Sequence, residues 1–216
     1  MNRKSICLLG LLVALVLVLP TDIKAQTFGV DFSNTTGALS LGNPPFTLGW
    51  SFTLTAPTQV GDLAFYNDGS EVGLTDSHQI GIWDSTGTLL VSGTVLAGTA
   101  STLVDQWREV AITPTTLGPG TYDIGALFLD GSDPVWFPGQ SLTGFVTAPG
   151  LTYNGATFAF GSTLSDPNIS DGNPGFFGAN FVETVGTPEP SSTLLLGIST
   201  GLLGLFGMVS RRNAAW

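Results

Sequence analysis

The side chains best suited to bind a cation lie in one short stretch of this sequence, NDGSEVGLTDS from Asn67 to Ser77. Four of its residues carry a carboxylate or amide oxygen, namely Asn67, Asp68, Glu71 and Asp76. Calcium takes about six to eight oxygen ligands, and the glycines of this stretch let the chain turn around an ion. The spacing does not match an EF-hand, and ordinary hairpin turns also use Asn, Asp and Gly. The stretch therefore predicts either a calcium site that stabilises the fold or a plain turn.

The single histidine limits the catalytic chemistry that this sequence offers. Because His78 stands alone, a histidine cluster for zinc is excluded. A Ser-His-Asp triad would need Ser77 or a distant serine together with Asp76 or Asp84, but adjacent strand residues point to opposite faces. We therefore interpret His78 as a strand residue that packs beside Trp83 or bonds to the backbone.

Glutamates provide the remaining enzymatic alternative. Glu71, Glu109 and Glu183 are available as the acid and base of a glycosidase, but nothing in their spacing selects two of them. The sequence therefore favours a protein without catalytic activity, and a secreted carboxylate-dependent glycan hydrolase is the alternative.

Alternation of apolar and polar residues dominates residues 28–183. In FTLGWSFTLT, from Phe46 to Thr55, a Phe, Leu or Trp occupies every second position, which predicts a strand with one buried face. Similar runs are separated by Gly, Pro, Asp and Asn turns, and no long window keeps a helical period. The pattern predicts about eight to ten antiparallel strands in an all-β fold, a β-sandwich or jelly roll. Trp136 lies in the proline-bounded DPVWFPGQ and is the candidate for stacking on a glycan.

Charges are distributed unevenly along the chain. Of its 16 acidic and six basic residues, 15 acidic residues and a single basic one, Arg108, lie in residues 26–190. An acidic domain repels phosphate backbones, so the sequence predicts no nucleic-acid partner. Cys7 is the only cysteine and lies near the N-terminus, so no disulfide is expected.

The N-terminal residues have the layout of a secretory signal peptide. Arg3 and Lys4 precede an apolar run, and the small residue Ala25 ends the segment. Cleavage between Ala25 and Gln26 would leave an exported domain that has passed through a secretion translocon. The sequence thus divides into a signal peptide at 1–25, a β-sandwich domain at 26–186 and a C-terminal segment at 187–216.

The C-terminal segment predicts a membrane helix. Residues 191–210 carry no charge and, as a helix, would span about 30 Å, the thickness of the hydrocarbon core. Arg211 and Arg212 follow at once, and positive charge stays on the cytoplasmic side, which places the domain outside. The tetrapeptide TPEP, from Thr187 to Pro190, comes directly before the helix.

Pro-Glu-Pro, one apolar span and a terminal arginine pair together resemble the PEP-CTERM sorting signal of exported bacterial proteins. The resemblance implies recognition of Pro188, Glu189 and Pro190 by an exosortase, a membrane-embedded protease of Gram-negative bacteria that make extracellular polysaccharide. It also implies an inner-membrane-anchored precursor that, once processed, reaches the cell surface or the extracellular matrix of a biofilm. Exopolysaccharide is then the expected partner, in a structural or glycan-binding role.

The central region resembles an exported bacterial β-sandwich domain of unknown function. The similarity rests on FTLGWSFTLT, on the strand SHQIGIW from Ser77 and on the later run WREVAITPTTLGPGTYDIGALF. It supports the fold class and implies no reaction.

Overall fold

The computed structural model of this chain describes residues 26–33, 39–40, 45–69, 71–136, 142–172 and 175–184. These residues form strands and loops, and no helix among them is long and apolar enough to cross a membrane. The predicted signal peptide, the Pro-Glu-Pro motif, the membrane helix at 191–210 and the arginine pair all lie outside the described residues. Residues Gln26–Val185 form one compact unit.

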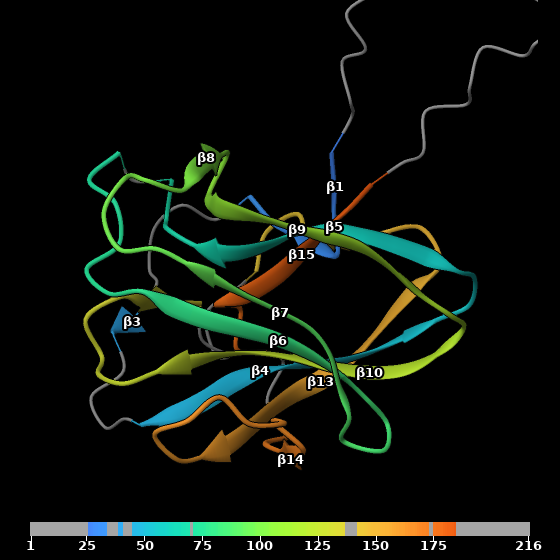
Figure 1. The fold of residues 1–216 in the computed structure, drawn as a ribbon. Coiled ribbons are helices and arrows are strands. Elements are labelled where there is room, and N and C mark those ends of the chain that lie inside the picture. The colour runs from blue at the N-terminus through green and yellow to red at the C-terminus, as the bar shows by residue number, and fades with distance from the viewer. Residues whose placement is uncertain are drawn as a thin grey trace, which may run out of the picture. The chain divides into compact units, whose positions relative to one another are not determined.

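Two antiparallel sheets make up most of this unit (Figure 1). The five-stranded sheet has the order β1 (Thr27–Phe28), β15 (Ala179–Glu183), β5 (Thr58–Tyr66), β9 (Trp107–Leu117) and β8 (Thr102–Val104). The six-stranded sheet has the order β14 (Ile169–Ser170), β13 (Leu151–Phe160), β4 (Phe46–Leu54), β10 (Gly120–Phe128), β6 (His78–Asp84) and β7 (Leu89–Val95). Two short pairs join β11 (Pro134–Val135) to β3 (Leu39–Ser40) and β12 (Val146–Thr147) to β2 (Val30–Asp31). The predicted all-β class is confirmed, with antiparallel sheets in a sandwich-like arrangement.

The two sheets face each other (Figure 1), and aromatic side chains pack between them. The ring of Phe65 on β5 lies 5.4 Å from that of Phe128 on β10, and Phe181 on β15 lies 5.3 Å from Phe52 on β4. The alternation in β4 has the predicted consequence, because four of its large apolar residues are at most 4% exposed: Leu48, Trp50, Phe52 and Leu54. Burial of such large side chains is the main source of stability for a fold of this kind.

Strand register shows which side chains of the five-stranded sheet face away from this core. Because Phe65 points into the core, the preceding residue, Ala64, points outward. Directly paired residues share a face, and Ala64 pairs with Asn180 of β15 and with Glu109 of β9. Asn180 and Glu109 therefore lie on the outer face of the five-stranded sheet.

The N-terminal segment packs on this outer face. Asn180 holds its backbone, since the side-chain nitrogen donates to Val30 O at 2.7 Å and the side-chain oxygen accepts from Val30 N at 3.2 Å. The ring of Phe32 lies 5.6 Å from the rings of both Tyr66 and Trp107, which pair in register on β5 and β9. These contacts extend the apolar core onto the outer face of the five-stranded sheet.

A row of glycines crosses the six-stranded sheet. Gly125 of β10 pairs with Gly49 of β4 on one side and with Gly81 of β6 on the other. A Cβ atom at Gly125 would lie 2.9 Å from Cγ of Pro167, too close for real side chains. The row thus leaves room for the segment before β14 to lie directly against the sheet.

Candidate functional site

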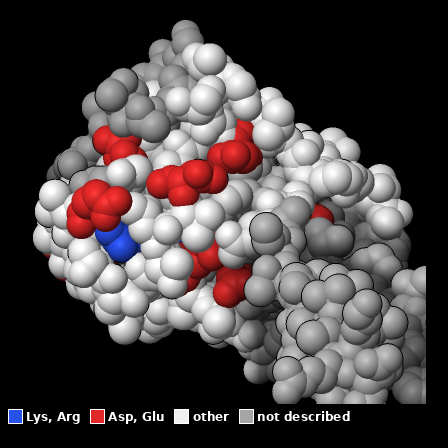
Figure 2. All heavy atoms as spheres, turned by 90° about the horizontal axis from the view of Figure 1, so that it is seen from above, with Lys and Arg blue, Asp and Glu red and all other residues white. Residues whose placement is uncertain are grey.

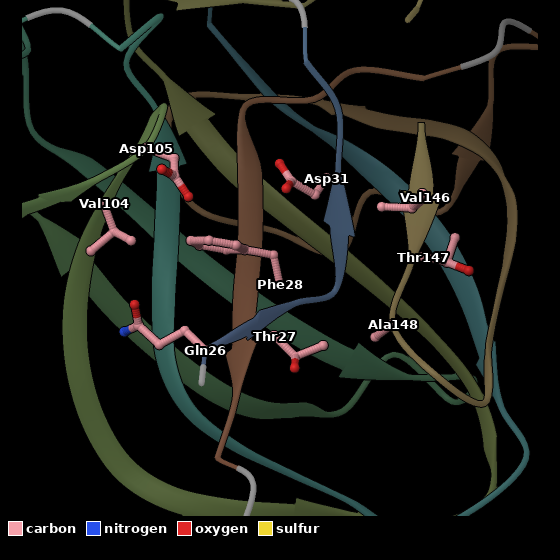
Figure 3. Close-up of a pocket in the computed structure, with 9 residues that line it drawn as sticks. All are labelled: Gln26, Thr27, Phe28, Asp31, Val104, Asp105, Val146, Thr147 and Ala148. Atoms are coloured by element: carbon pink, nitrogen blue, oxygen red, sulfur yellow. The ribbon is translucent and has the colours of Figure 1, made fainter. Parts of the chain in front are cut away.

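A pocket of about 380 Å³ opens beside the N-terminal segment (Figure 3). Three parts of the chain form it: the segment that contains β1 and β2, the turn between β8 and β9, and the segment that contains β12. Its lining residues are Gln26, Thr27, Phe28, Asp31, Val104, Asp105, Val146, Thr147 and Ala148. Carboxylates, hydroxyls and an aromatic ring meet in this hollow, which makes it the candidate binding site.

The turn between β8 and β9 places Asp105 at the pocket. Strand β8 ends at Val104 and β9 begins at Trp107, so Asp105 and Gln106 make a two-residue turn. Asp105 has a φ of 53°, in the left-handed region that Asp tolerates better than most residues. The sharp turn leaves Asp105 exposed, so its carboxylate is accessible to a ligand.

Asp31 is held in place through one of its oxygens. Oδ1 accepts hydrogen bonds from Phe32 N at 2.9 Å, from Gln106 Nε2 at 3.2 Å and from Trp107 Nε1 at 3.3 Å. The Gln106 amide also donates to Phe32 O at 2.6 Å, which ties the N-terminal segment to the turn. Figure 3 shows the carboxylates of Asp31 and Asp105 at the same end of the pocket. The fold therefore presents a pair of negatively charged groups there.

Glu109 is a buried carboxylate that one hydrogen bond links to the lining of the pocket. It is 8% exposed, and its Oε2 accepts a hydrogen bond at 2.9 Å from Nε2 of Gln26, which lines the pocket. Its other oxygen, Oε1, is buried and has no hydrogen-bond partner among the described residues. Burial raises the pKa of Glu109, the hydrogen bond from Gln26 lowers it in part, and the charges of Asp62 and Asp105 raise it further. Protonation of Glu109, or a cation close to it, would reduce the cost of burying this carboxylate near other negative charges.

The surface around the pocket is acidic. Figure 2 shows the molecule from above in the view of Figure 1, with Asp and Glu atoms spread over this side of the five-stranded sheet. Arg108 is the only Lys or Arg among the described residues. It is 2% exposed, and its Nη1 donates to Ser101 O at 2.9 Å. A basic residue that would neutralise Asp31 or Asp105 is absent from the nine described lining residues.

The structure places His78 inside the sandwich core and not at an accessible site. Its ring is stacked on Phe65, with centroids 3.7 Å apart, and it contacts Phe128 at 5.0 Å. Nδ1 lies 3.0 Å from Leu127 O, and Nε2 lies 3.0 Å from Asp133 Oδ2. The predicted bond to the backbone is confirmed, but the neighbouring rings are phenylalanines and not Trp83. Both ring nitrogens are engaged, so His78 is not free to act as a general base.

Asp133, the partner of His78, was not singled out by the sequence. Its two oxygens also accept hydrogen bonds at 2.7 Å from Thr75 N and Asp76 N. Burial raises the pKa of Asp133, but hydrogen bonds from His78 and the two backbone amides more than offset this, so the pKa lies below its usual value. The His78 ring therefore lies between two groups that accept hydrogen bonds, the Leu127 carbonyl and the Asp133 carboxylate. The signal in the sequence was weak, since DGSDP is also an ordinary turn.

The four residues predicted to bind calcium are not gathered into one site. Asn67 is buried, while Asp68 accepts a hydrogen bond from Tyr66 Oη at 2.9 Å. Glu71 is exposed, and Asp76 lies next to Asp130, which contributes to raising the pKa of Asp76. Where the structure describes the chain, no group of three or more His, Cys, Asp or Glu side chains is arranged to hold a metal ion.

Trp136 is packed inside the molecule. It is 2% exposed, its ring centroid lies 6.0 Å from that of Phe32, and it forms an isolated β-bridge with Phe177. A sugar needs an open aromatic face, so the burial of Trp136 contradicts the stacking role predicted for it. The aromatic residue that the structure does place at a pocket is Phe28.

The register also separates two glutamates of the enzymatic alternative. Glu109 pairs with Ala64 and Glu183 pairs with Val60, and these two β5 positions are about 13 Å apart along the strand. Glu71 lies in the exposed loop between β5 and β6. Burial raises the pKa of Glu183 as well as that of Glu109, but the strand pairing does not set them opposite each other.

Comparison with known proteins gives one match. A family model described as "Domain of unknown function (DUF4082)" matches residues 31–176, more than half of the chain. No curated protein and no solved structure matches the chain. The matched range includes most of the pocket lining, from Asp31 to Ala148.

Proposed function

This chain belongs to the family of the domain of unknown function DUF4082, and on that premise we propose that it is an exported glycan-binding protein without catalytic activity. Its place of action is the cell surface or the extracellular polysaccharide matrix. An exosortase-type protease processes the precursor at the Pro-Glu-Pro motif. The ligand is a polysaccharide segment held in the pocket beside the N-terminal segment.

Export and processing are supported by the order of features at the two ends of the sequence. A basic start, an apolar run and Ala25 precede the domain, while Pro-Glu-Pro, an uncharged span and an arginine pair follow it. The prolines keep the motif extended and separate the span from the domain. Glu189 would then be accessible to a protease at the outer face of the inner membrane.

Glycan binding is supported by one observation, the composition of the pocket. Phe28 lines the pocket but is only 8% exposed, so the apolar surface comes mainly from Val104, Val146 and Ala148. Asp31 and Asp105 contribute oxygens that accept hydrogen bonds from hydroxyl groups. Thr27 and Thr147 add smaller polar groups at the rim. An apolar surface with a few convergent polar groups is typical of sites that bind small polar molecules and sugars.

A binding experiment with the full chain in mild detergent tests this proposal. Fluorescently labelled oligosaccharides of several compositions are titrated and followed by anisotropy, first on the wild type and then on Asp105→Asn. We expect Asp105→Asn to weaken binding about threefold to fivefold, as removal of a partly exposed charge does. Asn also tolerates the left-handed backbone at this position, so the turn is retained.

Two controls separate this function from its alternatives. Glu71→Gln removes an exposed carboxylate that does not line the pocket, so its binding should equal that of the wild type. Release of reducing ends from the same oligosaccharides, abolished in Glu109→Gln, would instead establish the hydrolase. Failure of every oligosaccharide to bind would refute the glycan-binding function.

A further inference from the structure

We propose that the pocket selects glycans that carry free amino groups, protonated as ammonium, over neutral or acidic glycans. This inference rests on the proposed glycan-binding function and adds the chemical class of the ligand. The observation that carries it is the combination of an open acidic pocket with a buried carboxylate that is hydrogen-bonded to the lining residue Gln26 and has one oxygen without a partner among the described residues.

The lining of the pocket attracts positive charge. Among the nine described residues that line it, Asp31 and Asp105 are the titratable ones, and both are acidic. Three hydrogen bonds hold Asp31 in place through Oδ1, so this charge is fixed where the ligand would lie. An ammonium group offers three donors and no acceptor, which suits a site of carboxylate oxygens.

Glu109 provides the second, independent observation. It is 8% exposed, lies on the outer face of the five-stranded sheet, and is hydrogen-bonded to the lining residue Gln26. A buried acceptor without a partner destabilises the folded protein, and a donor that reaches it removes that cost. A ligand ammonium near Gln26 would stabilise Glu109 as an ion, which a neutral hydroxyl group does less effectively.

The rest of the described surface excludes the opposite class of ligand. Arg108, the one basic residue that the structure describes, is buried and donates to Ser101 O. Glycans rich in carboxylate or sulfate would therefore meet a surface on which Asp and Glu atoms outnumber those of Arg108, which is only 2% exposed (Figure 2). Repulsion of like charges disfavours such ligands, whereas the same field attracts cationic ones.

Three oligosaccharides of equal length provide the test: oligomers of glucosamine, of N-acetylglucosamine and of galacturonic acid. Each is titrated into the full chain in detergent, at a pH at which the glucosamine amines are protonated. We expect glucosamine oligomers to bind about tenfold more tightly than the N-acetylated ones, and the galacturonate oligomers to bind most weakly. High salt should reduce the advantage of the glucosamine oligomers, because salt screens charge attraction.

Variants locate the preference within the molecule. Asp105→Asn and Glu109→Gln should each lower the affinity for glucosamine oligomers about threefold to fivefold more than the affinity for N-acetylglucosamine oligomers. Glu71→Gln, which removes the same charge away from the pocket, should change neither affinity. An equal loss in Glu71→Gln would show that only the net charge matters and would overturn the inference.

The possible failures are distinguishable. If N-acetylglucosamine oligomers bind as tightly as glucosamine oligomers and Asp105→Asn weakens both, the preference for ammonium is wrong and the glycan site stands. If none of the three oligomers binds but another oligosaccharide of the panel does, the ammonium preference is wrong and the glycan site stands; if no oligosaccharide binds, both fail.

Discussion

The sandwich core and the outer-face pocket both bury a carboxylate, but the chain satisfies the two carboxylates to different degrees. In the core, both oxygens of Asp133 accept hydrogen bonds, from two backbone amides and from His78. Beside the pocket, one oxygen of Glu109 accepts a bond from Gln26 and the other has no partner among the described residues. A buried polar group without a partner costs about 1–3 kcal/mol. The core carboxylate therefore serves the fold, whereas the pocket carboxylate is left able to accept a further bond.

The largest expected effect follows from breaking the core pair. Asp133→Ala leaves buried His78 and the amides of Thr75 and Asp76 without their shared acceptor, and we expect the free energy of unfolding to fall by about 3–5 kcal/mol. Urea denaturation at neutral pH measures this loss. Glu71→Ala, at an exposed loop position, should stay within about 0.5 kcal/mol of the wild type. If the two variants were equally stable, the core pair would not have the structural role assigned to it.

A smaller effect is expected where the N-terminal segment is attached to the outer face. Asn180→Ala removes both hydrogen bonds to the Val30 backbone, which should cost about 2–3 kcal/mol. Hydrogen exchange at the Val30 amide should accelerate more than exchange at amides of the sandwich core. Thr184→Ala, which removes an exposed hydroxyl just past the end of the same strand, is the matched control. Unchanged exchange at Val30 would mean that other contacts hold the segment.

The smallest expected effect concerns pH and Glu109. Its pKa is raised in the folded state, so the folded protein binds more protons than the unfolded chain between the ordinary pKa and the raised one. Stability therefore falls as pH rises through that window. Glu109→Gln should remove the contribution of Glu109 to this fall of stability with pH. At neutral pH the substitution should raise the free energy of unfolding by about 1 kcal/mol. Part of the fall of stability with pH should persist in this variant, because burial also raises the pKa of Asp123 and Glu183.

Melting temperatures of the wild type and Glu109→Gln, measured from mildly acidic to neutral pH, check this prediction. The difference between the two proteins should grow as pH rises. A difference in melting temperature that is constant with pH would show that both oxygens of Glu109 already have hydrogen-bond partners in the folded state. Glu109 and Asp133 would then not differ in the way described above.

Local patterns predicted the strands well. The alternation of β4 correctly assigned Leu48, Trp50, Phe52 and Leu54 to the core, because a strand has a fixed period of two. The same pattern placed Thr47 towards water, yet Thr47 is fully buried and its hydroxyl accepts a hydrogen bond from Ser165 N at 3.2 Å. A segment far along the chain covers that face, and no local pattern records this.

The pocket was not predictable in the same way. Its residues come from 26–31, 104–105 and 146–148, and their proximity depends on tertiary packing. Asp133 likewise meets His78 across 55 positions of the sequence. Trp136 was misassigned because its neighbouring prolines suggested an open loop, whereas contacts with Phe32 bury it. The export and sorting signals lie outside the described residues and stay predictions.

The pairing of β1 with β15 has a consequence for how this domain can be connected. Thr27 lies opposite Glu183, so the first and last strands of the compact unit are hydrogen-bonded neighbours. Ends that meet in this way allow circular permutation: a short linker can join residue 184 to residue 26, and the chain can be reopened at the exposed turn between β6 and β7. The strand order of both sheets would be retained, and the pocket would then be carried by a chain whose two ends lie at the six-stranded sheet.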